Sequence, residues 1–158
     1  MRHISINNRI FVILEDAKWS VSHIKAVRNV LNVCALNKKG LSVKLTNDYG
    51  IKELNYKWRG IKKPTNVLSF PNNLNKDKSI NAYQYLGDIL ISYDTLKKET
   101  TIYKVPFVNH LSHILIHGIL HLKGYKHDLW REENIMKKEE IRILEMLNIN
   151  TAYLKRLF

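Results

Sequence analysis

The chain has 158 residues, of which 45% are hydrophobic, and it contains only 6 glycines and 3 prolines. This composition supplies apolar surface for a core and excludes that of a disordered chain, so we expect one domain spanning residues 1–158. Lys and Arg outnumber Asp and Glu by 26 to 14, which gives a formal net charge of +12. A charge this large favours polyanionic partners, either nucleic acid or an anionic membrane surface.

The single cysteine and the N-terminal sequence bear on the cellular compartment. Cys34 has no second cysteine to pair with, which excludes an intramolecular disulfide and suits a reducing compartment. The first residues do not form the apolar core of a signal peptide, and no run approaches the roughly 18 apolar residues of a membrane span. We therefore expect a cytoplasmic protein with no membrane partner.

Hydrophobic periodicity predicts strands and helices in alternation. Strands are predicted at residues 4–6, 10–14, 41–46, 67–70 and 86–92. Helices are predicted from about residue 20 to a stop at Gly40, and at about 48–58, 93–100, 107–122 and 129–147. The polar stretch 72–81 is interpreted as a surface loop. This order predicts an α+β fold, with a small mixed sheet packed against several helices.

A group of histidines lies in the C-terminal half of the chain. His117 and His121 are four residues apart on a predicted helix, so their side chains share one face about 6 Å apart and can bind one ion. Gly124 can adopt positive φ and end the helix, which lets His127 approach from the following loop. The spacing therefore predicts a metal-binding helix whose ion is held by His117, His121 and His127.

Neighbouring histidines do not complete this ligand set. His113 is eight residues from His121, about 12 Å along a helix axis, which is too far for both to bind one ion. A pair of His113 with His117 is possible, but only the later pair is followed by a glycine turn and another histidine. We interpret His110 and His113 as packing residues, as residues that orient a ligand, or as part of the substrate surface.

Three histidine ligands without a fourth Cys or His leave one coordination position open. That is the form of a catalytic zinc site, in which zinc lowers the pKa of a bound water and supplies a hydroxide for hydrolysis. The string HGILHLKGYKH is similar to the HExxHxxGxxH motif of metzincin proteases. Gly118 stands where those enzymes carry their Glu general base, so peptide hydrolysis by that route lacks its base.

The same string resembles, residue by residue, the signature HGxLHLxGYDH of the YbeY family of bacterial metallo-endoribonucleases. The segment LNYKWRGIKKPTNVLSFP at 54–71 and the segment LGDI at 86–89 resemble two further motifs of that family, in the same order. The resemblance implies an α+β fold and one Zn²⁺ per chain on the three histidines. It also implies cleavage of single-stranded RNA in the maturation of the 16S ribosomal RNA 3′ end and in ribosome quality control, with the ribosomal small subunit and assembly factors as partners.

The resemblance also assigns roles to individual residues. It gives Arg59 a catalytic role beside His117, and a guanidinium suits this because it can bridge two phosphate oxygens. Lys126 stands where the family usually has Asp before the third histidine, and Asp128 on the other side can take the place of that carboxylate. Asp88 of LGDI, His113 and Asp128 are the candidates to orient a metal ligand through a hydrogen bond.

Two other functions remain open from the sequence. A metzincin-like zinc peptidase is favoured by the histidine spacing and opposed by Gly118 and the basic charge. A non-enzymatic RNA-binding or ribosome-binding module with a structural zinc is favoured by the basic surface. Cleavage of casein that a chelator inhibits would support the peptidase. Equal nuclease activity with and without zinc, together with loss of the fold when the metal is removed, would support the module.

Overall fold

The computed structural model describes residues 1–72 and 84–156, and within them a five-stranded sheet in the order β1-β2-β3-β5-β4. The strands are β1 (Arg2–Ser5), β2 (Ile10–Leu14), β3 (Lys39–Thr46), β4 (Val67–Pro71) and β5 (Gln84–Ser92). β2, β3 and β5 run parallel, while β1 and β4 pair antiparallel at the two edges. The sheet is therefore mixed, and the predicted α+β fold is confirmed.

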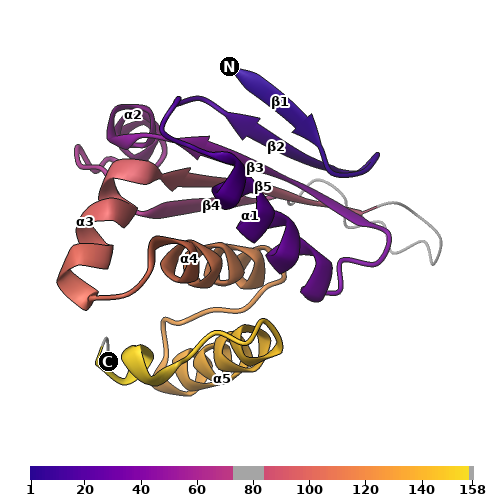
Figure 1. Ribbon diagram of the computed structural model, residues 1–158, viewed down its shortest axis with the longest axis vertical. Helices are drawn as coiled ribbons and strands as arrows, with labels where there is room; N and C mark the ends of the chain where they lie inside the picture. The colour runs from indigo at the N-terminus through magenta and orange to yellow at the C-terminus, as the bar shows by residue number, and fades with distance from the viewer. Residues whose placement is uncertain (73–83, 157–158) are drawn as a thin grey trace.

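The helices pack on both faces of this sheet. They are α1 (Val21–Val33), α2 (Asp48–Arg59), α3 (Tyr93–Tyr103), α4 (Phe107–Leu122) and α5 (Trp130–Met146), followed by the short 3₁₀ helix η1 (Ala152–Arg156). Figure 1 shows α1 and α4 on one face of the sheet and α2 on the opposite face. α5 lies beyond α4, away from the sheet, so α4 is enclosed between two layers.

Alternation along the strands decides which face each side chain meets. Leu41, Val43 and Leu45 of β3 are fully buried on the face that carries α1 and α4. The intervening Lys44 points to the other face, where it pairs with Glu15 at 2.8 Å. On β2, Phe11 on that other face is 42% exposed, so this face is less covered than the first.

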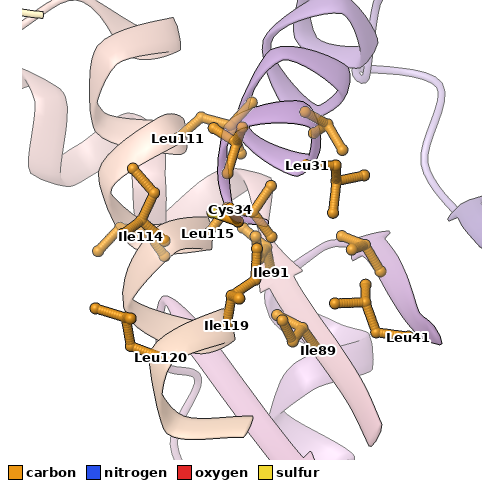
Figure 2. Packing of buried hydrophobic residues seen from close by; sticks show 14 of the residues in the cluster. Leu31, Cys34, Leu41, Ile89, Ile91, Leu111, Ile114, Leu115, Ile119 and Leu120 are labelled. Atoms are coloured by element: carbon orange, nitrogen blue, oxygen red, sulfur yellow. The ribbon is translucent and has the colours of Figure 1, made fainter. Parts of the chain in front are cut away.

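The main core lies between α4, α1 and the sheet. Leu111, Leu115 and Ile119 of α4 are fully buried and face Ile89 and Ile91 of β5 (Figure 2). Truncating one such side chain to alanine costs about 2–5 kcal/mol, because the lost contacts leave a cavity. Fixing α4 against the sheet in this way also fixes the direction in which its opposite face points.

One predicted helix ends earlier than expected. Gly40 was interpreted as the stop signal of the first helix, but α1 ends at Val33 and Gly40 lies inside β3. Between them the chain turns at Ala35 and Lys38, which have positive φ of 49° and 51°. The prediction was wrong because Leu36 is buried although it lies in a tight turn. Hydrophobic periodicity alone cannot tell a buried residue in such a turn from one in the last turn of a helix.

The remaining boundaries agree with the sequence to within a few residues, apart from η1, which was not predicted. α2 ends at Gly60, which adopts a left-handed φ of 71° as its stop signal requires. The loop predicted at 72–81 lies outside the described residues except for Asn72. Among the helices that the structure describes, none is long and apolar enough to cross a membrane.

Candidate metal centre

The predicted metal-binding helix is α4, whose two faces serve different purposes. Gly118 faces the sheet, where a Cβ would lie 3.1 Å from both the Ile89 Cγ2 and the Ser69 Oγ. His117 and His121 lie together on one flank of α4, beside this contact with the sheet. Their Nε2 atoms lie 3.0 Å apart there, and both side chains are half-buried.

His127 reaches the same point because the chain reverses after α4. Gly124 adopts a φ of 99°, and the Tyr125 N–H donates to the carbonyl oxygen of Leu120 at 3.0 Å, which closes the helix with a left-handed turn. The ring of His127 then lies 4.7 Å from that of His121 and 5.6 Å from that of His117, between centroids. One ligand atom from each of the three histidines lies within 4.8 Å of the others.

Hydrogen bonds on the second ring nitrogens orient two of these side chains. The His117 Nδ1–H donates to the Glu140 Oε1 at 2.6 Å, and the His121 Nδ1–H donates to the carbonyl oxygen of Tyr125 at 3.0 Å. Because a carboxylate and a carbonyl oxygen only accept hydrogen bonds, the proton of each ring lies on Nδ1. The lone pair of each Nε2 then points toward the space between the three histidines. Burial lowers the pKa of His121, and the neighbouring His117 lowers it further, which favours the neutral imidazole that a metal needs.

Glu140 of α5 is the residue that the sequence analysis missed. Its carboxylate is 3% exposed and accepts a second hydrogen bond from the His113 Nε2 at 2.8 Å. Burial raises the pKa of this carboxyl group, but the hydrogen bonds from His113 and His117 outweigh burial and lower the pKa to about 2. Glu140 therefore carries its negative charge behind His117 at neutral pH, which would make His117 a better electron donor to a bound metal.

The donor set fits zinc. Two nitrogens at tetrahedral positions 2.0–2.1 Å from zinc would lie about 3.3 Å apart, and the Nε2 atoms of His117 and His121 are 3.0 Å apart. Neutral imidazoles are ligands that zinc binds well, and a set of three leaves one position for water or substrate. Among the described residues, no other group of three such side chains lies close enough to hold an ion.

A pocket of about 200 Å³ opens beside the histidines, between β4, α4 and α5. His117 and His127 line it together with Asn66, which comes just before β4, and Lys137 of α5. The Asn66 Nδ2 donates to Glu99 at 3.2 Å, and the Glu99 carboxylate also lies 2.8 Å from the Nε2 of the buried His110. His110 is thus a packing residue whose partner holds a pocket side chain in place.

The other predicted site residues occupy different places. His113 is 5% exposed and shares Glu140 with His117, so it lies directly behind the group of three histidines. Asp88 faces away from α4 and accepts hydrogen bonds from the hydroxyls of Ser42 and Tyr85. Asp128 is exposed, and no hydrogen bond among the described residues joins it or Asp88 to a histidine of the three.

Arg59 lies at the exposed C-terminal end of α2. Its Nη1 is 3.5 Å from the Asn55 Oδ1, and the part of the chain that the structure describes gives it no contact with the three histidines. α2 packs on β4 and β5 from the face opposite α4. The loop that follows Arg59 leads to Asn66 at the pocket. Only a few residues therefore separate Arg59 from the pocket along the chain.

Fold and site together define a class of protein: an α+β domain whose three-histidine centre has an open position, which is the arrangement of a metal-dependent hydrolase. The sequence model of the family described as endoribonuclease YbeY matches residues 7–148. The chain therefore belongs to the endoribonuclease YbeY family.

Individual relatives agree with this assignment. The endoribonuclease YbeY of Ehrlichia chaffeensis is 44% identical over 119 residues, which cover 75% of this chain and 74% of that protein. The endoribonuclease YbeY of Nitrobacter hamburgensis is 47% identical over 115 residues, covering 72% of this chain and 60% of that protein. The solution structure of TM1509 from Thermotoga maritima superposes with a TM-score of 0.59 at 27% identity, covering 87% of this chain and 86% of that one.

Proposed function

We propose that this chain is a zinc-dependent endoribonuclease that cleaves single-stranded RNA. The observation that carries the proposal is the open three-histidine centre in a chain of the endoribonuclease YbeY family. We place its substrate in ribosomal RNA, in maturation of the 16S 3′ end and in ribosome quality control. The ribosomal small subunit and its assembly factors are the proposed partners, and the net charge of +12 supports contact with RNA.

Each residue of the proposed site has a separate role. Zinc, when bound by His117, His121 and His127, supplies a Lewis acid for the scissile phosphate and lowers the pKa of water. Glu140 keeps His117 in the tautomer that presents Nε2, and the Tyr125 carbonyl oxygen does the same for His121. The pocket beside the histidines receives the nucleotide next to the scissile bond, with Asn66 and Lys137 on its walls.

Arg59 is the proposed phosphate-binding side chain. A guanidinium forms paired hydrogen bonds with two phosphate oxygens and stabilises the negative charge that builds on phosphorus in the transition state. Its exposed position at the end of α2 leaves it available for a long substrate that passes from α2 around β4 to the pocket. Because the side chain is exposed, we expect its replacement to leave the fold in place, so that it tests chemistry separately from stability.

The peptidase alternative conflicts with the packing of α4. In a metzincin-like site the residue after the first histidine carries the general base, and here that residue is Gly118. A side chain at Gly118 would point into β4 and β5, because its Cβ would already lie 3.1 Å from the Ser69 Oγ and the Ile89 Cγ2. No carboxylate at this position could reach a substrate at the histidines.

The test is chelation and reconstitution with a product analysis. Protein stripped of metal should lose cleavage of a single-stranded RNA and regain it with one equivalent of zinc. A 5′-phosphate on the downstream product would identify water as the nucleophile, and a 2′,3′-cyclic phosphate on the upstream product would identify the 2′-hydroxyl. Equal cleavage by the stripped and the loaded protein would instead exclude zinc from catalysis and leave it a structural role.

A further inference from the structure

The C-terminal half of α2 and the loop after it carry an unusual surface. Tyr56 and Trp58 are large aromatic side chains, yet they are 51% and 64% exposed. The segment from Lys52 to Lys63 contains five cationic side chains and one carboxylate, that of Glu53. Isolated exposed aromatics are common, but two of them among this many cations form a surface that packing within the chain does not explain.

Ammonium groups lie beside both rings. The Lys62 Nζ is 4.7 Å from the centroid of the Tyr56 ring, and the Lys57 Nζ is 5.5 Å from that of Trp58. Each distance is within the range of a cation–π interaction, so the positive charge is held next to the aromatic face. Trp58 is also supported from β4, because its ring lies 6.2 Å from that of Phe70. The rings are thus positioned while much of their surface stays open to solvent.

The loop after α2 connects this surface with the pocket at the histidines along the chain. The Asn55 Nδ2 donates to the carbonyl oxygen of Lys63 at 2.8 Å, which ties the loop to α2. Asn66, three residues further on, lines the pocket, so the Cα atoms of these two residues are at most roughly 11 Å apart. A strand that leaves the pocket along this loop is therefore led toward the helix that carries the two rings.

We propose that Tyr56 and Trp58 stack on unpaired bases of the RNA next to the cleaved bond, while Lys57 and Lys62 contact the phosphates between those bases. Cations that follow the backbone and aromatic rings that stack on bases are the combination by which proteins bind single-stranded nucleic acid. Stacking is independent of base identity but requires an unpaired base, so this surface selects single strands over duplexes. The proposal rests on the proposed function, because it assigns the substrate of that site.

The experiment measures binding of zinc-loaded protein to a labelled single strand of 2′-O-methyl RNA with phosphorothioate linkages, which resists cleavage. Tyr56→Ala and Trp58→Ala should each weaken binding by roughly 5- to 150-fold, the usual effect of removing one stacked ring. Trp58→Phe, which keeps a ring against Phe70, should restore most of the affinity. Thermal melting of each variant checks that the fold is retained.

Tyr49→Ala is the matched control. Tyr49 is a 74% exposed aromatic at the N-terminal end of the same helix, where its hydroxyl pairs with the Glu53 carboxylate instead of lying beside an ammonium group. Its removal should leave RNA affinity unchanged. A duplex of the same sequence should bind wild type and Trp58→Ala equally, because its bases have no free face.

The proposal is overturned if the two variants bind the single strand like wild type, which would assign the surface to a protein partner instead. It is also overturned if Tyr49→Ala loses as much affinity, or if Trp58→Ala loses duplex binding to the same extent. Failure of the proposed function would look different: the wild type would bind the strand through Tyr56 and Trp58 without cutting ordinary RNA.

Discussion

The Glu140 carboxylate lies 2.6 Å from the His117 Nδ1, although the two residues belong to different helices and are 23 positions apart. This contact joins α5 to the metal-binding face of α4. Because the same carboxylate also accepts from His113, one buried charge orients His117, a proposed ligand, and links the two helices.

Replacement of this carboxylate should weaken metal binding. Glu140→Gln keeps the shape of the side chain but removes its charge, and loss of a partner behind a metal ligand typically lowers metal affinity 10- to 100-fold. Competition with a chelating dye measures the zinc dissociation constant. Glu139→Gln is the control, because Glu139 lies next in the sequence but pairs with the exposed Arg142 at 2.5 Å. Equal zinc affinity in wild type and Glu140→Gln would contradict this role.

The low pKa of Glu140 also predicts how stability depends on pH. A carboxyl group whose pKa falls from 4.5 when unfolded to about 2 when folded stabilises the fold above pH 4.5 and loses that contribution as pH falls toward 2. The contribution is of the order of 3 kcal/mol. Urea unfolding of metal-free wild type and Glu140→Gln should therefore differ most near neutral pH and converge in acid. A difference that stays constant from pH 6 to pH 2 would count against the lowered pKa.

The turn at Gly124 should matter for the metal as well as for the fold. Gly124→Ala forces a side chain into a φ of 99° and should destabilise the protein by about 1–2 kcal/mol. It should also lower zinc affinity, because this turn places His127 beside His117 and His121. Gly60→Ala is a matched control, since Gly60 also has positive φ, of 71°, and open space around it, but ends α2 instead. Both variants should lose stability, and loss of zinc affinity is expected only in Gly124→Ala.

Charge reversal at Arg59 should separate catalysis from metal binding. Arg59→Glu should reduce cleavage of single-stranded RNA by at least roughly 100-fold, because the side chain would then repel the phosphate it is proposed to bind. Zinc content should stay at the wild-type value, since Arg59 has no contact with the histidines among the described residues. Arg28→Glu makes the same charge change on an exposed position of α1 and controls for net charge. Full activity in Arg59→Glu would exclude the phosphate role.

Local periodicity was sufficient to predict α4 and the grouping of its histidines. His117 and His121 lie on one face because they are four residues apart in a helix, and Gly124 turns the chain because only a small set of residues tolerates its φ. Glu140 could not be assigned to this site in the same way. A carboxylate between the apolar Met136 and Ile143 on the buried face of α5 is a visible signal, but only tertiary packing decides which partner it meets.

Asp88 shows the opposite case, in which a motif suggested a site role that strand geometry does not support. Ile89 and Ile91 face α4 in the core, and side chains alternate along a strand, so Asp88 must face the other side of the sheet. There its carboxylate binds Ser42 and Tyr85. The sequence shows this alternation of side chains. It does not show which face of the sheet carries the histidines.

The most direct test of the three-histidine zinc centre is metal content by elemental analysis, together with cleavage of a single-stranded RNA. It compares wild type with His117→Ala, His121→Ala and His127→Ala. We expect one zinc per wild-type chain, and in each variant a loss of the metal together with RNA cleavage. A wild-type protein that cuts RNA without bound metal, or a variant that keeps stoichiometric zinc, would contradict it.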